Sequence, residues 1–153
     1  MKRSERILEW TEGMSAGTPE VDANHQRLIA LISELDPSNT KRTNAAELHK
    51  RLQHVIDHTE RHFEREEKFL REWRYSNADV HASSHKLVLK ILKRIRDSFI
   101  PCGHEAGWPE AALKIKNLLV SHILAEDMQC ELFQFSKRER SSSKENQEWR
   151  HPH

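Results

Sequence analysis

The sequence has few of the residues that interrupt helices and few that build a disulfide framework. Its 153 residues include four glycines, five prolines and two cysteines. Because glycine and proline cluster in a few places, long segments are uninterrupted, which indicates helices, and no strand pattern competes with them. The cysteines, Cys102 and Cys130, form neither a CxxC pair nor a disulfide framework, which is typical of a protein from a reducing cytoplasm.

An excess of charge of one sign and long apolar runs are also missing. There are 25 Lys and Arg residues against 24 Asp and Glu, a formal net charge of +1, which argues against a nucleic-acid partner. No stretch approaches about eighteen apolar residues, so the sequence predicts no membrane span. The N-terminal MKRSERILEW has no apolar run after its basic residues and differs from a secretory signal. We therefore expect a cytoplasmic protein.

Four amphipathic segments lie between the clustered glycines and prolines. In each of them, apolar residues recur at helical spacing. The predicted helices span residues 19–35, 44–73, 77–100 and 108–135. Because short connections join consecutive helices, the sequence predicts an all-α fold, an antiparallel up-down-up-down four-helix bundle.

The predicted bundle is one domain flanked by two segments of different character. About 150 residues can bury a single core without disulfides. We assign residues 1–135 to this domain, including an N-terminal arm that packs onto the bundle as a nonhelical strap. Residues 136–153 are charged and serine-rich and lose apolar periodicity, so we expect a disordered polar tail. The tail is the candidate contact for a protein partner, and the bundle is expected to be a monomer.

Histidine, by contrast, is abundant: the chain has 11, roughly three times the ordinary frequency. Two pairs with a spacing of four residues, His62 with Glu66 and His81 with His85, each lie on one face of a helix and can converge on one ion. In an antiparallel hairpin, groups equally far from the turn lie at the same level. This rule places seven side chains at one level of the bundle: His25, His62, Glu66, His81, His85, His122 and Asp127.

Five imidazoles and two carboxylates exceed the needs of a single ion. A tetrahedral zinc ion takes about four ligands and an octahedral ion about six, whereas two ions that share bridging carboxylates would use all seven. Imidazole and carboxylate without thiolate suit iron or manganese. The five-residue step from His122 to Asp127 rotates by about 140° on a regular helix. We therefore predict a local π-bulge that turns Asp127 back toward the other ligands.

These motifs resemble the hemerythrins, in particular the single-domain bacterial forms, over about residues 8–135. The matching pieces, which follow Trp10, are VDANHQRL at 21–28, HFEREEKFL at 62–70, HASSH at 81–85 and HILAED at 122–127. The resemblance implies a non-haem di-iron site that binds dioxygen reversibly. It implies that one iron is bound by His81, His85 and His122. The other iron is bound by His25 and His62. Two carboxylates, Glu66 and Asp127, bridge the irons together with an oxo or hydroxo group. The iron with two histidines has an open position for dioxygen.

The chain departs from the hemerythrin pattern at a few positions. Asn24 stands where glutamine is usual, Leu70 where methionine is frequent, and Ser76 where proline often follows the tyrosine. His58, one turn before His62, occupies a position often held by an aromatic or other noncharged residue. Three roles are open for it, a hydrogen-bond partner near the site, an extra ligand or a proton donor. A partly exposed histidine at the rim is the simpler interpretation.

Around the predicted ligands, Leu28, Phe63 and Leu119 are candidates for a dry pocket. The remaining histidines are expected at the surface: His49, His54, His104, His151 and His153. The leading hypothesis for function is an oxygen carrier, store or sensor, without a catalytic residue. The alternatives are a di-iron oxidoreductase that acts on peroxide or nitric oxide, and a signalling module in which the iron state alters exposure of the tail.

Overall fold

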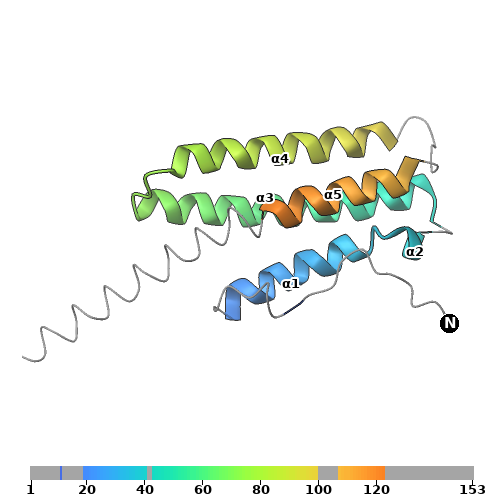
Figure 1. Ribbon diagram of the computed structural model, residues 1–153, viewed down its shortest axis with the longest axis horizontal. Helices are drawn as coiled ribbons and strands as arrows, with labels where there is room; N and C mark the ends of the chain where they lie inside the picture. The colour runs from blue at the N-terminus through green and yellow to red at the C-terminus, as the bar shows by residue number, and fades with distance from the viewer. Residues whose placement is uncertain (1–10, 12–18, 41–42, 100–106, 123–153) are drawn as a thin grey trace, which may run out of the picture.

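The computed structural model describes residues 11, 19–40, 43–99 and 107–122. Its helices are α1 (Pro19–Ser33), α2 (Pro37–Thr40), α3 (Ala45–Glu72), α4 (Ala78–Phe99) and α5 (Trp108–His122). The four longer helices alternate in direction, because α1 and α4 run one way across Figure 1 while α3 and α5 run the other. The predicted all-α, antiparallel up-down-up-down four-helix bundle is confirmed, and the described ranges contain no strand.

Several predictions fall on parts of the chain outside the described residues. They concern the N-terminal arm, the fourth helix beyond His122 with its π-bulge and Asp127, and the 136–153 tail. One short element was not predicted: the connection between the first two long helices contains α2. Pro37 has the fixed φ that suits a first helical position, and the Thr40 hydroxyl donates to the Pro37 carbonyl over 3.3 Å.

Local capping explains where α3 begins and ends. The Asn44 side chain accepts a hydrogen bond from the Glu47 amide over 2.9 Å, as an N-cap residue does. At the other end, Arg74 adopts a left-handed conformation with φ 52°. The Tyr75 amide then donates to the Leu70 carbonyl over 2.9 Å, and the Arg74 amide donates to the Arg71 carbonyl. This Schellman arrangement reverses the chain into α4 and sets how α3 and α4 lie against each other.

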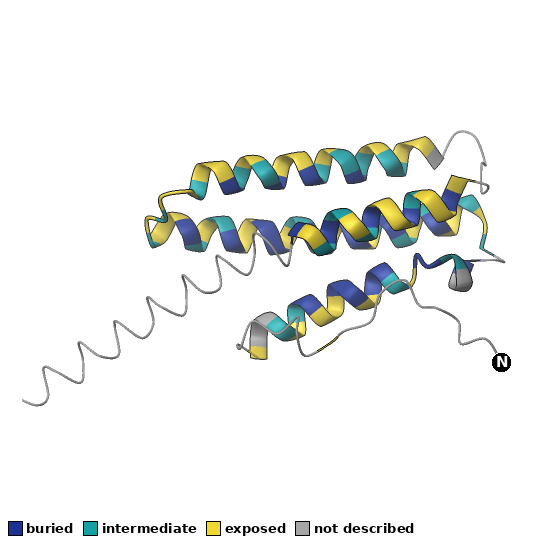
Figure 2. Ribbon diagram, viewed as in Figure 1, coloured by how far each residue is buried: buried dark blue, intermediate teal, exposed yellow. Residues whose placement is uncertain are grey.

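The apolar core lies to one side of the predicted ligands in all four long helices. In α1 and α4 its residues follow His25 and His85 in sequence, and in α3 and α5 most of them precede His62 and His122. Because the helices alternate in direction, these residues meet in one half of the bundle, and Figure 2 shows them as buried stripes. The Trp108 indole donates to the Leu35 carbonyl over 2.9 Å and ties α5 to the segment between α1 and α2.

Within the described part of the chain, none of the helices is both long enough and apolar enough to cross a membrane.

Candidate metal centre

The polar counterpart of the apolar core is a group of buried histidines around one glutamate. Six of the seven predicted ligands lie in the described residues, and each is at most 8% exposed: His25, His62, Glu66, His81, His85 and His122. Every long helix contributes at least one of them. Ionisable side chains are rarely buried to this extent unless they are paired or bind an ion. Asp127, the seventh predicted ligand, lies outside the described residues.

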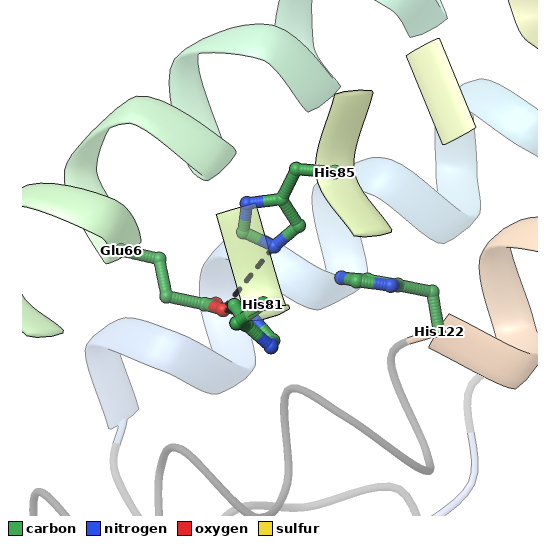
Figure 3. A group of neighbouring side chains, drawn as sticks. All are labelled: Glu66, His81, His85 and His122. Carbon is green, nitrogen blue, oxygen red and sulfur yellow. Dashed lines mark hydrogen bonds and ion pairs between the residues drawn. The ribbon is translucent and has the colours of Figure 1, made fainter. Parts of the chain in front are cut away.

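Four of these side chains form a compact cluster. One possible ligand atom from each of Glu66, His81, His85 and His122 lies within 4.8 Å of the others. Figure 3 shows the side chains converging from α3, α4 and α5. The imidazole centroids are 4.2 Å apart for His81 and His85, and 4.9 Å apart for His85 and His122. Three imidazoles and a carboxylate at this spacing are a donor set for one metal ion.

The Glu66 carboxylate also faces a second pair of histidines. Its Oε1 atom contacts Nε2 of His81 and lies 3.5 Å from Nε2 of His85, whereas its Oε2 atom lies 3.3 Å from Nε2 of His62. The His25 ring, from α1, lies edge-on to His62 with a centroid distance of 5.4 Å. The carboxylate therefore stands between a group of three imidazoles and a group of two.

The histidines also keep Glu66 ionised. Burial raises the pKa of this carboxyl, but the nearby imidazoles of His62, His81 and His85 outweigh burial and hold the pKa far below its ordinary value. An ionised carboxylate beside several imidazoles is a suitable ligand for a metal cation.

His85 shows how a ligand nitrogen is directed into the cluster. Both of its ring nitrogens are buried and neither makes a hydrogen bond. Its Nδ1 atom lies 3.8 Å from Oε1 of Glu67, which is 20% exposed, while Nε2 faces Glu66. A carboxylate behind the outer nitrogen is the usual partner of a metal-binding imidazole. Glu67 was not predicted as part of the site, and the only sequence signal for it is its position directly after Glu66.

An aromatic side chain covers one side of the three-histidine group. The Phe63 ring stacks on His85 with a centroid distance of 3.7 Å and an angle of 2° between planes, and it lies 4.9 Å from His122. Phe63 is 2% exposed, and Leu28 and Leu119 are buried as well. The three side chains expected to line a dry pocket are therefore all excluded from solvent.

The histidines outside this set differ in burial. His54 is exposed and His49 is half-buried, while His104, His151 and His153 lie outside the described residues. His58 is half-buried. Burial, together with the nearby His62, lowers the pKa of His58. Its partial exposure agrees with the simpler interpretation of a histidine at the rim.

The donor set fits metal ions on chemical grounds. The imidazole nitrogens gather around a shared carboxylate, and the core offers His85 no hydrogen bond. A buried acceptor without a partner costs about 1–3 kcal/mol, so a bound cation would stabilise this arrangement. There is no thiolate among these side chains, which favours iron or manganese over a structural zinc site.

Comparison with known proteins points in the same direction. Residues 16–130 match the family model of the Hemerythrin HHE cation binding domain. A bacteriohemerythrin of Stenotrophomonas maltophilia (strain R551-3) is 26% identical over 121 residues, which cover 79% of this chain and 77% of the relative. A bacteriohemerythrin of Pseudomonas aeruginosa (strain LESB58) is 24% identical over 120 residues, which cover 78% of this chain and 76% of the relative. With its antiparallel bundle and buried histidine and glutamate cluster, the chain belongs to the hemerythrin family.

Proposed function

We propose that this protein holds two non-haem iron ions in its bundle and binds dioxygen reversibly at them, as an oxygen carrier, store or sensor. The observation that carries the proposal is the position of Glu66, whose two oxygens face different groups of histidines. If Glu66 bound a single ion, histidine ligands on one side of the carboxylate would be enough. The family membership and the names of the relatives support iron and dioxygen over other metals and ligands.

The proposed ligands divide as the distances suggest. His81, His85 and His122 would hold one ion, His25 and His62 the other, and Glu66 would bridge them. The family resemblance, and no distance, adds Asp127 as the second bridging carboxylate. A reduced iron pair held by these residues would supply the electrons that dioxygen accepts. Because the second ion has fewer histidines than the first, dioxygen would approach on the side of His25 and His62.

The surrounding side chains determine whether binding is reversible. Phe63, Leu28 and Leu119 are buried and carry no proton that they could donate. A dry, apolar wall keeps water away from the reduced form of oxygen and slows its loss by protonation. Glu67, 3.8 Å from the outer nitrogen of His85, would help to orient that ring when a metal ion is bound.

The test uses the full-length protein, loaded with iron and reduced under argon. Metal analysis should find two irons per chain, and visible absorption bands should appear with dioxygen and disappear under argon through repeated cycles. Irreversible oxidation in the first cycle would contradict oxygen carriage. If that oxidation is accompanied by sustained consumption of hydrogen peroxide or nitric oxide, the protein is a di-iron oxidoreductase instead.

A further inference from the structure

The outer side of α4 carries a groove that is lined mainly by cations. The hollow has a volume of about 540 Å³, and two of its lining residues, Leu89 and Asp97, are not basic. The other four are lysine or arginine: Lys86, Lys90, Lys93 and Arg94. Figure 2 shows that the side of α4 turned away from the other helices is largely exposed. The groove therefore lies on the surface, whereas His81 and His85 of the same helix are buried.

Most of these cations have no counter-charge within the described part of the chain. Lys93 is paired, because its Nζ atom lies 3.3 Å from Oε1 of Glu60 on α3. The Asp97 carboxylate accepts a hydrogen bond from Arg96 over 2.9 Å, so its charge is already compensated. Three exposed residues form no ion pair with another described residue: Lys86, Lys90 and Arg94. Three positive charges are therefore available to a ligand from outside the chain.

The three unpaired cations form a regular row. They follow one another at intervals of four residues, so they lie on consecutive turns of one helix face, about 6 Å apart along the axis. The row is thus about 12 Å long. Like charges at this spacing repel each other and weaken the helix that carries them. A bound ligand of opposite charge would remove this repulsion.

Charge, more than shape, distinguishes this groove from the rest of the described surface. A second hollow, of about 530 Å³, lies on α5, and its charged lining residues are one of each sign, Glu110 and Lys114. Cations also recur on the exposed face of α3, but Glu64 and Glu72 each lie four residues from Lys68 there. In a chain with a formal net charge of +1, the row on α4 is a local concentration of positive charge.

We propose that the groove on α4 binds an acidic peptide segment of a partner protein through Lys86, Lys90 and Arg94. Carboxylates four residues apart on a helix, or two apart on an extended chain, repeat at about 6–7 Å and match the row. The Arg94 guanidinium can donate two hydrogen bonds to one carboxylate. None of these residues is a predicted metal ligand, so the inference is independent of the proposed two-ion site.

Other occupants match the row less well. A nucleic acid is favoured by a broad excess of positive charge, and the near balance of charges in this chain does not provide one. The chain's own tail, residues 136–153, has more basic than acidic residues, so its net charge repels the row. A separate acidic segment is the occupant that the charges favour.

The experiment measures binding of a fluorescent deca-glutamate peptide to the full-length protein by fluorescence anisotropy at low ionic strength. One variant neutralises the row with glutamine, which has similar helix propensity: Lys86→Gln, Lys90→Gln and Arg94→Gln combined. The matched control removes the same number of charges from exposed positions of α3: Arg61→Gln, Arg65→Gln and Lys68→Gln combined.

The wild type and the α3 variant should bind the peptide with similar affinities. Each exposed charge pair contributes a factor of about two to five, so the α4 variant should bind about tenfold more weakly or worse. Added salt should weaken binding to the wild type, because it screens exposed charges. Circular dichroism checks that both variants remain helical. Should the α4 variant fail to fold, Lys90→Gln alone must weaken binding more than Arg65→Gln does.

Three results would overturn the inference. If the wild type does not bind the peptide, the groove is a solvated helix face. If the two triple variants lose affinity equally, the attraction comes from the overall charge of the protein and not from the groove. A single-stranded DNA oligonucleotide of the same charge is the last comparison. If it binds as tightly as the peptide and is lost in the same variant, the row recognises polyanions in general, and an acidic peptide is the wrong partner.

Discussion

Oε2 of Glu66 lies 3.3 Å from Nε2 of His62, one turn earlier on the same helix, while Oε1 of the same carboxylate contacts His81 on the neighbouring helix. A single side chain therefore connects histidines of α3 with histidines of α4. The i, i+4 spacing brings His62 to one oxygen, and the packing of α3 on α4 brings His81 to the other. This relationship makes Glu66 the side chain on which the two halves of the proposed site depend.

Replacing Glu66 by glutamine should prevent the protein from holding two ions. The amide keeps the shape but loses the charge, and it presents an NH2 group where the second oxygen stood. We expect the affinity for at least one ion to fall by about 100-fold or more. This loss is larger than the one expected when a residue that contacts a metal ligand, but not the metal, is removed. Metal analysis after dialysis measures this, and Glu64→Gln, an exposed glutamate on the same helix, is the control. Two tightly bound ions in Glu66→Gln would contradict a bridging role.

Glu67→Gln should have a smaller effect on the same measurement. Glu67 lies 3.8 Å from the outer nitrogen of His85, and its partial exposure screens the interaction. We expect binding of the ion held by His85 to weaken by about tenfold, the low end for such partners. Stability of the metal-free protein should hardly change. Unchanged metal affinity would mean that Glu67 is a surface residue with no influence on His85.

Phe63→Leu should shorten the lifetime of the oxygenated protein. The Phe63 ring stacks on His85 and makes an edge contact with His122. Leucine leaves part of this space empty, and the space then admits water. The loss of packing should cost about 1–2 kcal/mol of stability. Decay of the visible bands in air measures the lifetime. Phe69→Leu, in which the ring removed stacks on Trp73 instead, should leave this decay unchanged. Equal decay in the two variants would assign no protective role to Phe63.

The turn between α3 and α4 allows a prediction about stability alone. Arg74 has φ 52°, a conformation that costs a residue with a side chain about 1–2 kcal/mol and costs glycine almost nothing. After the greater flexibility of unfolded glycine is subtracted, Arg74→Gly should stabilise the protein by about 0.5–1 kcal/mol. Thermal unfolding measures the change. Arg71→Gly, the same replacement in the last turn of α3, should instead destabilise the protein by about 1 kcal/mol.

Much of this arrangement could be predicted from residue spacing. Apolar periodicity predicted four long helices, and equal distances from the turns predicted that His25, His62, His81 and His122 share one level of the bundle, where the structure has them buried. Spacing identifies which residues share a face, because the helical repeat is fixed. The end of α1 was placed two residues late, since the buried Leu35 continues the apolar pattern beyond the last regular turn at Ser33.

Contacts that depend on how one helix is rotated against another could not be predicted. The approach of Glu67 to His85 is set by the packing of α3 on α4, and no periodicity marks it. Left-handed Arg74 was missed for a related reason, because glycine or asparagine usually marks such a turn.

Ending the chain at residue 135 tests the proposed domain division. The six buried predicted ligands lie within residues 25–122, and the predicted seventh, Asp127, precedes the truncation. The shortened protein should therefore bind the same number of ions and show the same visible bands as the full chain, with thermal unfolding within about 2 °C, because a solvated tail adds little to a packed core. Loss of either property would assign residues 136–153 to the bundle. If the spectrum persists while binding to a partner protein is lost, the tail has a separate signalling role.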